Sequence, residues 1–148
     1  MKSVRLAVLA AMLLPVATTV HALEFRSVGA APAIMYDAPS AKGRKVFVAP
    51  RGMPVEVVLT YGEWIKVRDA RGDLAWIEAR MLTPRRNLVV SAANARIRSS
   101  AEDAAPVVFT ADKGVLLEMV DPVSAGWVKV RHRDGQSGFV RVAEIWGE

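Results

Sequence analysis

An internal repeat with an offset of 62 to 63 residues is the feature that most constrains this chain. At an offset of 63, residues 64–68 (W-I-K-V-R) align with residues 127–131 (W-V-K-V-R), and Gly72 aligns with Gly135. Upstream of one turn the offset falls to 62, because the second copy has one residue more in that turn. Insertions are tolerated best in turns, so the repeat predicts two versions of one small fold.

Within each copy the pattern is that of short β-strands. Apolar and polar residues alternate over 54–60 and 63–68, as they do in strands with one buried face, and Gly, Pro, Asp or Ser separates the apolar runs. We expect strands near residues 33–36, 45–48, 54–60, 63–68 and 74–78, and again near 95–98, 107–110, 115–121, 127–132 and 138–141. Each copy is expected to close with one helical turn, at 78–82 and at 142–145.

Five short strands in about 60 residues bury an apolar face by curling into a small barrel. The pattern therefore predicts an all-β protein with two five-stranded β-barrels in tandem. The connection at 83–87 is short and polar, so the barrels are expected to touch. Trp146, close to the carboxyl end, is expected either to cap the second barrel or to rest on the first.

The first 22 residues have the pattern of an export signal. Lys2 and Arg5 precede an apolar run over 6–16, and V-H-A at 20–22 has the small or apolar residues that a signal peptidase requires. We expect cleavage after Ala22, which divides the chain into a signal peptide (1–22), a first domain (23–83) and a second domain (84–148). The apolar run is shorter than the roughly 20 residues of a membrane-spanning helix, so no membrane anchor is expected after cleavage.

Composition excludes several functional classes once the signal is removed. The remaining chain has 18 basic and 15 acidic residues, a net charge of +3, no cysteine and one histidine, His132. A cysteine nucleophile and a disulfide are therefore excluded, and a Ser-His-Asp triad would have to use His132 beside Asp134. Clustered metal ligands are also missing from the sequence. We expect no enzymatic activity, no cofactor and no metal.

Four features carry a family resemblance. They are the W-I-K-V-R-like strand, the D-x-x-G turn, the following strand (Ala75-Trp76-Ile77 and Gly138-Phe139-Val140) and the opening Y-D-A-P-S at 36–40. Together they resemble the bacterial SH3-like (SH3b) domain, twice, over roughly residues 28–146. The first copy departs from the pattern with Ala75 in place of Gly. The second departs with Arg98-Ser99 in place of Tyr36-Asp37 and with Phe139 in place of Trp.

Such modules often accompany cell-wall hydrolases, and no hydrolase partner is seen on this chain. The resemblance therefore implies a module that binds without hydrolase activity. A strand's period of two places the aromatic and basic residues of the W-x-K-x-R strands on one face. Such a face can stack on a sugar ring and pair with anionic groups. The candidate ligand-binding residues are Tyr36, Trp64, Lys66, Arg68, Trp76, Trp127, Lys129 and Arg131. In the competing interpretation, each Trp covers the end of its own barrel and has a packing role.

The sequence thus predicts an exported, periplasmic or secreted, non-enzymatic binding or adaptor module that recognises peptidoglycan or an envelope protein. The alternative is a structural or regulatory module that binds another periplasmic protein and no glycan. Nucleic acid is a minor alternative: Arg85-Arg86, Arg44, Lys45 and Arg51 favour it, but the low net charge and the predicted export argue against it.

Overall fold

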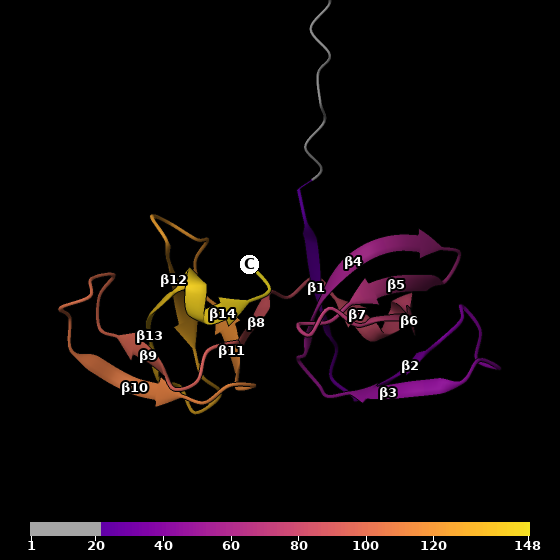
Figure 1. The fold of residues 1–148 in the computed structure, drawn as a ribbon, viewed down its shortest axis with the longest axis horizontal. Helices are drawn as coiled ribbons and strands as arrows, with labels where there is room; N and C mark the ends of the chain where they lie inside the picture. The colour runs from indigo at the N-terminus through magenta and orange to yellow at the C-terminus, as the bar shows by residue number, and fades with distance from the viewer. Residues whose placement is uncertain (1–21) are drawn as a thin grey trace, which may run out of the picture.

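The computed structural model describes residues 22–148, which form two seven-stranded antiparallel sheets with no α-helix. The predicted signal peptide lies outside the described residues, apart from Ala22. Figure 1 shows the two sheets side by side, each curled around its own core. Among the described residues, no helix has the length and apolar character needed to cross a membrane.

The first sheet has the strand order β3-β2-β6-β5-β4-β1-β7. Its strands are β1 (Glu24–Val28), β2 (Ala33–Tyr36), β3 (Lys45–Ala49), β4 (Pro54–Tyr61), β5 (Trp64–Arg68), β6 (Leu74–Glu78) and β7 (Leu82–Thr83), with the 3-10 turn η1 (Ala79–Met81) between the last two.

The second sheet repeats the first, with the order β10-β9-β13-β12-β11-β8-β14. Its strands are β8 (Asn87–Val90), β9 (Ala95–Arg98), β10 (Val107–Ala111), β11 (Leu116–Met119), β12 (Trp127–Arg131), β13 (Ser137–Arg141) and β14 (Ile145–Trp146), with η2 (Val142–Glu144) before the last strand. The duplicated, all-β fold and the two closing turns are therefore confirmed.

Each sheet has two strands more than the five that the sequence predicts. The additions are β1 and β7 in the first repeat and β8 and β14 in the second. β1 pairs with both β4 and β7, and β8 pairs with both β11 and β14, so each added pair extends the sheet beyond the central hairpins. The added strands also bury apolar side chains, among them Val28 and Leu88.

Each barrel has a separate apolar core. The first core centres on Val55, Ile65, Val67 and Ile77, and the second on Leu88, Ile97, Leu117 and Val130. On β5 and β12 the residues between the Trp, Lys and Arg point inward, as the alternation predicts. Burial of these branched side chains is the main source of stability in a chain without disulfides.

The barrels touch through specific contacts at the connection between them. The side-chain amide of Asn87 donates a hydrogen bond of 2.9 Å to the carbonyl oxygen of Gly52, and its backbone N–H donates to Ser27 Oγ at 3.2 Å. Trp146 rests on the first barrel, where its ring meets the Phe25 ring edge-on at a centroid distance of 5.1 Å. The carboxyl end accordingly lies between the barrels in Figure 1.

Candidate functional site

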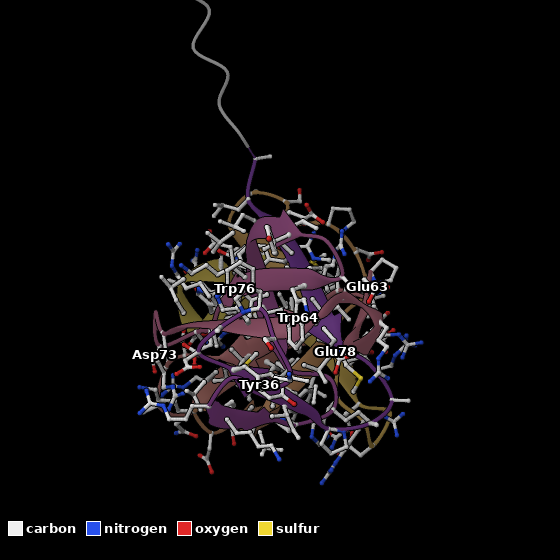
Figure 2. All side chains as sticks on the ribbon, turned by 90° about the vertical axis from the view of Figure 1, so that its right-hand side faces the viewer. Tyr36, Glu63, Trp64, Asp73, Trp76 and Glu78 are labelled. Atoms are coloured by element: carbon white, nitrogen blue, oxygen red, sulfur yellow. The ribbon has the colours of Figure 1, made fainter. Side chains whose placement is uncertain are left out.

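The outer side of the first barrel carries four aromatic residues in contact, Tyr36, Tyr61, Trp64 and Trp76, which we call the aromatic face. Tyr36 meets Trp64 edge-on at 5.5 Å, and Tyr61 meets Trp76 at 6.5 Å. The strand register places all four on one face of the sheet: Tyr61 lies opposite Trp64 on β4 and β5, and Tyr36 lies opposite Trp76 on β2 and β6. Figure 2 shows Tyr36, Trp64 and Trp76 on the side of the barrel that points away from the second repeat.

The four rings are not equally available to a ligand. Tyr61 is 65% exposed, Trp64 and Trp76 are partly buried, and Tyr36 is only 7% exposed. Tyr36 therefore supports the edge of Trp64 from below, while the other three present ring surface to solvent. This combination of packing and exposure means that the two interpretations of Trp64, binding and packing, are compatible in the first repeat.

The basic residues of β5 have separate partners. Lys66 Nζ lies 5.8 Å from the centre of the Trp76 ring, within the range of a cation–π contact. Arg68 instead reaches across to β4, where one of its nitrogens contacts both carboxylate oxygens of Glu56 at 3.0 and 3.1 Å. Lys66 thus lies beside the aromatic face, whereas the charge of Arg68 is already paired with Glu56.

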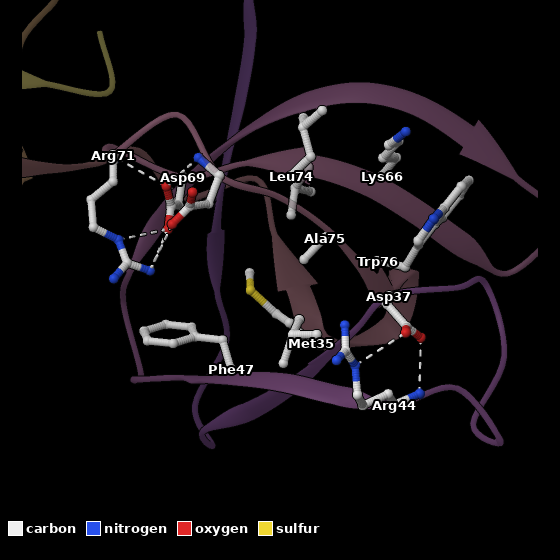
Figure 3. Close-up of a pocket in the computed structure, with 13 residues that line it drawn as sticks. Met35, Asp37, Arg44, Phe47, Lys66, Asp69, Arg71, Leu74, Ala75 and Trp76 are labelled. Atoms are coloured by element: carbon white, nitrogen blue, oxygen red, sulfur yellow. Dashed lines mark hydrogen bonds and ion pairs between the residues drawn. The ribbon is translucent and has the colours of Figure 1, made fainter.

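A pocket of about 430 Å³ continues from Trp76 and Lys66 along the barrel (Figure 3). Ion pairs stand at its two sides: Arg44 pairs with Asp37 at 3.4 Å on one side, and Arg71 pairs with Asp69 at 2.9 Å and with Asp73 at 3.4 Å on the other. Asp69 is buried because it holds the β5–β6 turn, accepting the backbone N–H groups of Arg71 and Asp73. The pocket therefore has paired charges at its rim and apolar side chains on its floor.

The second repeat places its equivalent residues differently. Trp127 is only 6% exposed, and the guanidinium carbon of Arg141 lies 4.5 Å from the centre of its ring. Arg141 is held in that place by Asp103, which accepts its Nε–H at 3.0 Å. This hydrogen bond, with a smaller contribution from the charge of Arg141, lowers the pKa of Asp103 and keeps the pair ionised.

In the second repeat, Lys129 and Arg131 make contacts equivalent to those of Lys66 and Arg68 in the first. Lys129 Nζ lies 6.0 Å from the centre of the Phe139 ring, and Arg131 pairs with Glu118 at 3.5 Å. Arg98, at the position of Tyr36, donates to the carbonyl oxygen of Ala105 at 2.9 Å and contributes no ring. Of the eight predicted residues, Tyr36 and Trp127 are therefore buried, Arg68 and Arg131 have acidic partners, and Trp64, Lys66 and Trp76 share one partly exposed surface in the first repeat.

The only histidine after residue 21 lies at the end of the second barrel. His132 Nδ1 is 3.1 Å from Asp134 Oδ2, and its ring packs beside Phe109 at 6.1 Å. Hydrogen bonds from the backbone and side chain of Gln136, followed by that of His132, lower the pKa of Asp134 to about 2. Across residues 22–148 no three His, Cys, Asp or Glu side chains come together in a way that would hold a metal ion.

Comparison with known families agrees with the fold. A model of the bacterial SH3 domain matches the chain twice, over residues 29–84 and 91–147. The chain therefore belongs to the bacterial SH3 domain family, as a tandem of two such domains. The sequence-based resemblance to SH3b domains is thereby confirmed.

Three solved structures have weak similarity to this chain. NlpC1 from Trichomonas vaginalis is 13% identical, with a TM-score of 0.41, and the match covers 95% of this chain and 51% of that one. NlpC2 from the same organism is 13% identical, with a TM-score of 0.40, over 86% and 49% of the two chains. An NlpC/P60 family protein from Bacillus cereus is 14% identical, with a TM-score of 0.37, over 82% and 55%. The chain thus spans about half the length of these structures. No curated protein matches it.

Proposed function

We propose that this protein is an exported, non-enzymatic binding module of the cell envelope and that the aromatic face of its first repeat binds peptidoglycan. The observation that carries the proposal is the group of Tyr61, Trp64 and Trp76 on one outer surface, with Lys66 beside Trp76. Flat aromatic surface binds the apolar faces of sugar rings, and a nearby ammonium pairs with carboxylates. Peptidoglycan offers both groups, sugar rings and the carboxylates of its peptide stems.

Membership of the family supports this ligand class, because bacterial SH3 domains are typically cell-wall binding modules. The export pattern at residues 1–22 supports a location in the periplasm or outside the cell, where the protein would meet the wall.

Binding is expected to be asymmetric between the repeats. Trp127 lies under Arg141, and Arg98 replaces the ring of Tyr36, so the second barrel offers less aromatic surface at the equivalent position. The first repeat therefore supplies the wall contact in this proposal, and the second repeat serves another purpose.

Co-sedimentation of the purified protein with peptidoglycan sacculi, over a series of salt concentrations, tests the proposal. Tyr61→Ala and Trp76→Ala are each expected to reduce retention about tenfold, the scale of a binding residue that carries much of the interaction energy. Val48→Ala is the matched control, because Val48 is similarly exposed (62%) but lies on β3. Circular dichroism of each variant establishes that the fold is intact.

Absence of sedimentation at every salt concentration would overturn the proposal. In that case the alternative, a structural or regulatory module that binds an envelope protein, is tested by crosslinking in intact cells. Retention of Tyr61→Ala and Trp76→Ala at the level of the unaltered protein would equally contradict the assignment of the site.

A further inference from the structure

A second candidate site lies between the two barrels, away from the aromatic face. The contacts of Asn87 with Gly52 and Ser27 bring the loop before β4 close to β8 and β11. Gly52 has φ = 81°, and a Cβ at this position would lie 3.2 Å from the Asn87 amide nitrogen. The positive φ favours glycine at this position, and the groove lies beside the contact.

The groove has a volume of about 620 Å³ and an excess of basic side chains. Arg51 lines it from the first barrel, while Arg131, His132 and Arg133 line it from the second. The acidic residue in its lining is Glu118, which lies 3.5 Å from Arg131. Three guanidinium groups thus face one carboxylate inside the groove.

Neighbouring charges do not remove this excess. Asp134, which lies beside His132, adds one negative charge near the groove, so the three arginines still outnumber the two carboxylates. Arg51 and Arg133 form no ion pair with any other residue in the described range 22–148. Both are exposed and come from different barrels, so one ligand in the groove would contact both.

We propose that this interdomain groove binds a ligand through its phosphate groups, with Arg51 and Arg133 as the main contacts. Guanidinium groups pair with phosphate oxygens in a forked geometry and remain charged at any physiological pH. A phosphate has oxygens in several directions, so it can accept hydrogen bonds from both sides of the groove at once. The backbone and apolar side chains of β11 form the rest of the wall and limit the size of the ligand.

The proposal is independent of the wall-binding function proposed above. The aromatic face lies on the side of the first barrel that points away from the second repeat, whereas the groove lies between the repeats. Variants of the two sites are therefore expected to affect their ligands separately, and failure of one proposal leaves the other intact.

Isothermal titration of the purified protein with inorganic tripolyphosphate tests the inference. Saturable binding with one site per chain is expected, weakened about tenfold by Arg51→Gln and by Arg133→Gln, which each remove a charge-assisted contact. Arg96→Gln is the matched control, since Arg96 is an exposed arginine on β9 outside the groove. In amide NMR spectra, the signals of Gly52 and Asn87 are expected to shift on binding.

Three results would overturn the inference. The first is that tripolyphosphate shows no saturable binding. The second is that Arg96→Gln weakens binding as much as the groove variants do, which means diffuse attraction to a basic surface. The third is that citrate binds equally tightly, which means that the groove does not select phosphate. Parallel titrations with glycerol 3-phosphate and with an eight-residue oligothymidylate distinguish a small phosphomonoester from a phosphodiester backbone as the source of the phosphate. The source is the compound whose binding is weakened by both Arg51→Gln and Arg133→Gln.

Discussion

Arg141 lies over the indole ring of Trp127, with its guanidinium carbon 4.5 Å from the ring centre. The two residues are direct partners on β12 and β13, and the same register in the first repeat pairs Trp64 with Glu78. Arginine has a cationic plane that covers an aromatic ring, but a glutamate has none. Trp127 is therefore covered by an arginine, whereas Trp64 has a glutamate at the equivalent position.

Replacing that arginine is expected to uncover Trp127. Arg141→Glu gives the second repeat the residue found at the equivalent position of the first, and it also breaks the ion pair with Asp103. We expect tryptophan fluorescence to become more sensitive to quenching by acrylamide and the thermal midpoint to fall slightly. Arg133→Glu is the control for the change of charge, and quenching that rises equally there would contradict the covering role of Arg141.

The reciprocal change is expected to cover Trp64. Glu78→Arg places a guanidinium opposite Trp64 on β6, so retention on peptidoglycan sacculi should fall because the partly exposed ring is covered. Glu102→Arg is the control, because Glu102 is exposed and lies in the second repeat, away from the aromatic face. Unchanged retention of Glu78→Arg would argue that the ligand does not contact Trp64.

The two repeats also differ in the space beside β2 and β9. A Cβ added at Gly138 would lie 2.5 Å from the carbonyl oxygen of Arg98 and 2.7 Å from Ile97 Cγ2, yet the equivalent residue of the first repeat is Ala75. Gly138→Ala is therefore expected to lower the free energy of unfolding by about 1–3 kcal/mol, the cost of overpacking.

Ala75→Gly is the matched comparison in the first repeat. It should cost less, about 0.5–1 kcal/mol, because it adds flexibility to a strand without creating a clash. Urea denaturation of both variants measures the difference. A larger loss for Ala75→Gly than for Gly138→Ala would contradict the packing described for β13.

The low pKa of Asp134 predicts a contribution to stability that depends on pH. Its hydrogen bonds with Gln136 lower the pKa from 3.8 to about 2, so the ionised carboxylate is favoured in the folded protein. A depressed carboxyl pKa stabilises the fold above the unfolded pKa, and this stabilisation is lost as the pH falls through 3.8 towards 2. The difference in unfolding free energy between the unaltered protein and Asp134→Ala should shrink over that interval. A difference that stays constant from pH 5 to about pH 2 would contradict the shift.

The repeat made most of the fold predictable from the sequence. The strand at 74–78 matches β6 in both of its bounds, and those at 33–36 and 95–98 match β2 and β9. β8 was missed because it directly follows a polar connection, although Leu88 and Val90 alternate with Asn87 and Val89 and are fully buried. A short strand that pairs with residues distant in sequence leaves a weak local pattern.

The candidate site was less predictable than the fold. Period-two alternation placed Trp64, Lys66 and Arg68 on one face, but it gives no information on what covers that face. The covering of Trp127 depends on Asp103, which is 38 residues from Arg141 in sequence. Likewise, the groove depends on contacts between two barrels whose cores are separate. The one local signal was the presence of Glu78 in the first repeat where the second has Arg141.

The measurement that tests the central claim most directly is an NMR titration with soluble peptidoglycan fragments that follows the indole N–H signals of the four tryptophans. Trp64 and Trp76 report on the aromatic face, Trp127 on the covered position of the second repeat, and Trp146 on the contact between barrels. The account predicts that the signals of Trp64 and Trp76 shift with saturation while those of Trp127 and Trp146 stay in place. Shifts confined to Trp127 or Trp146, or no shift at any of the four, would contradict it.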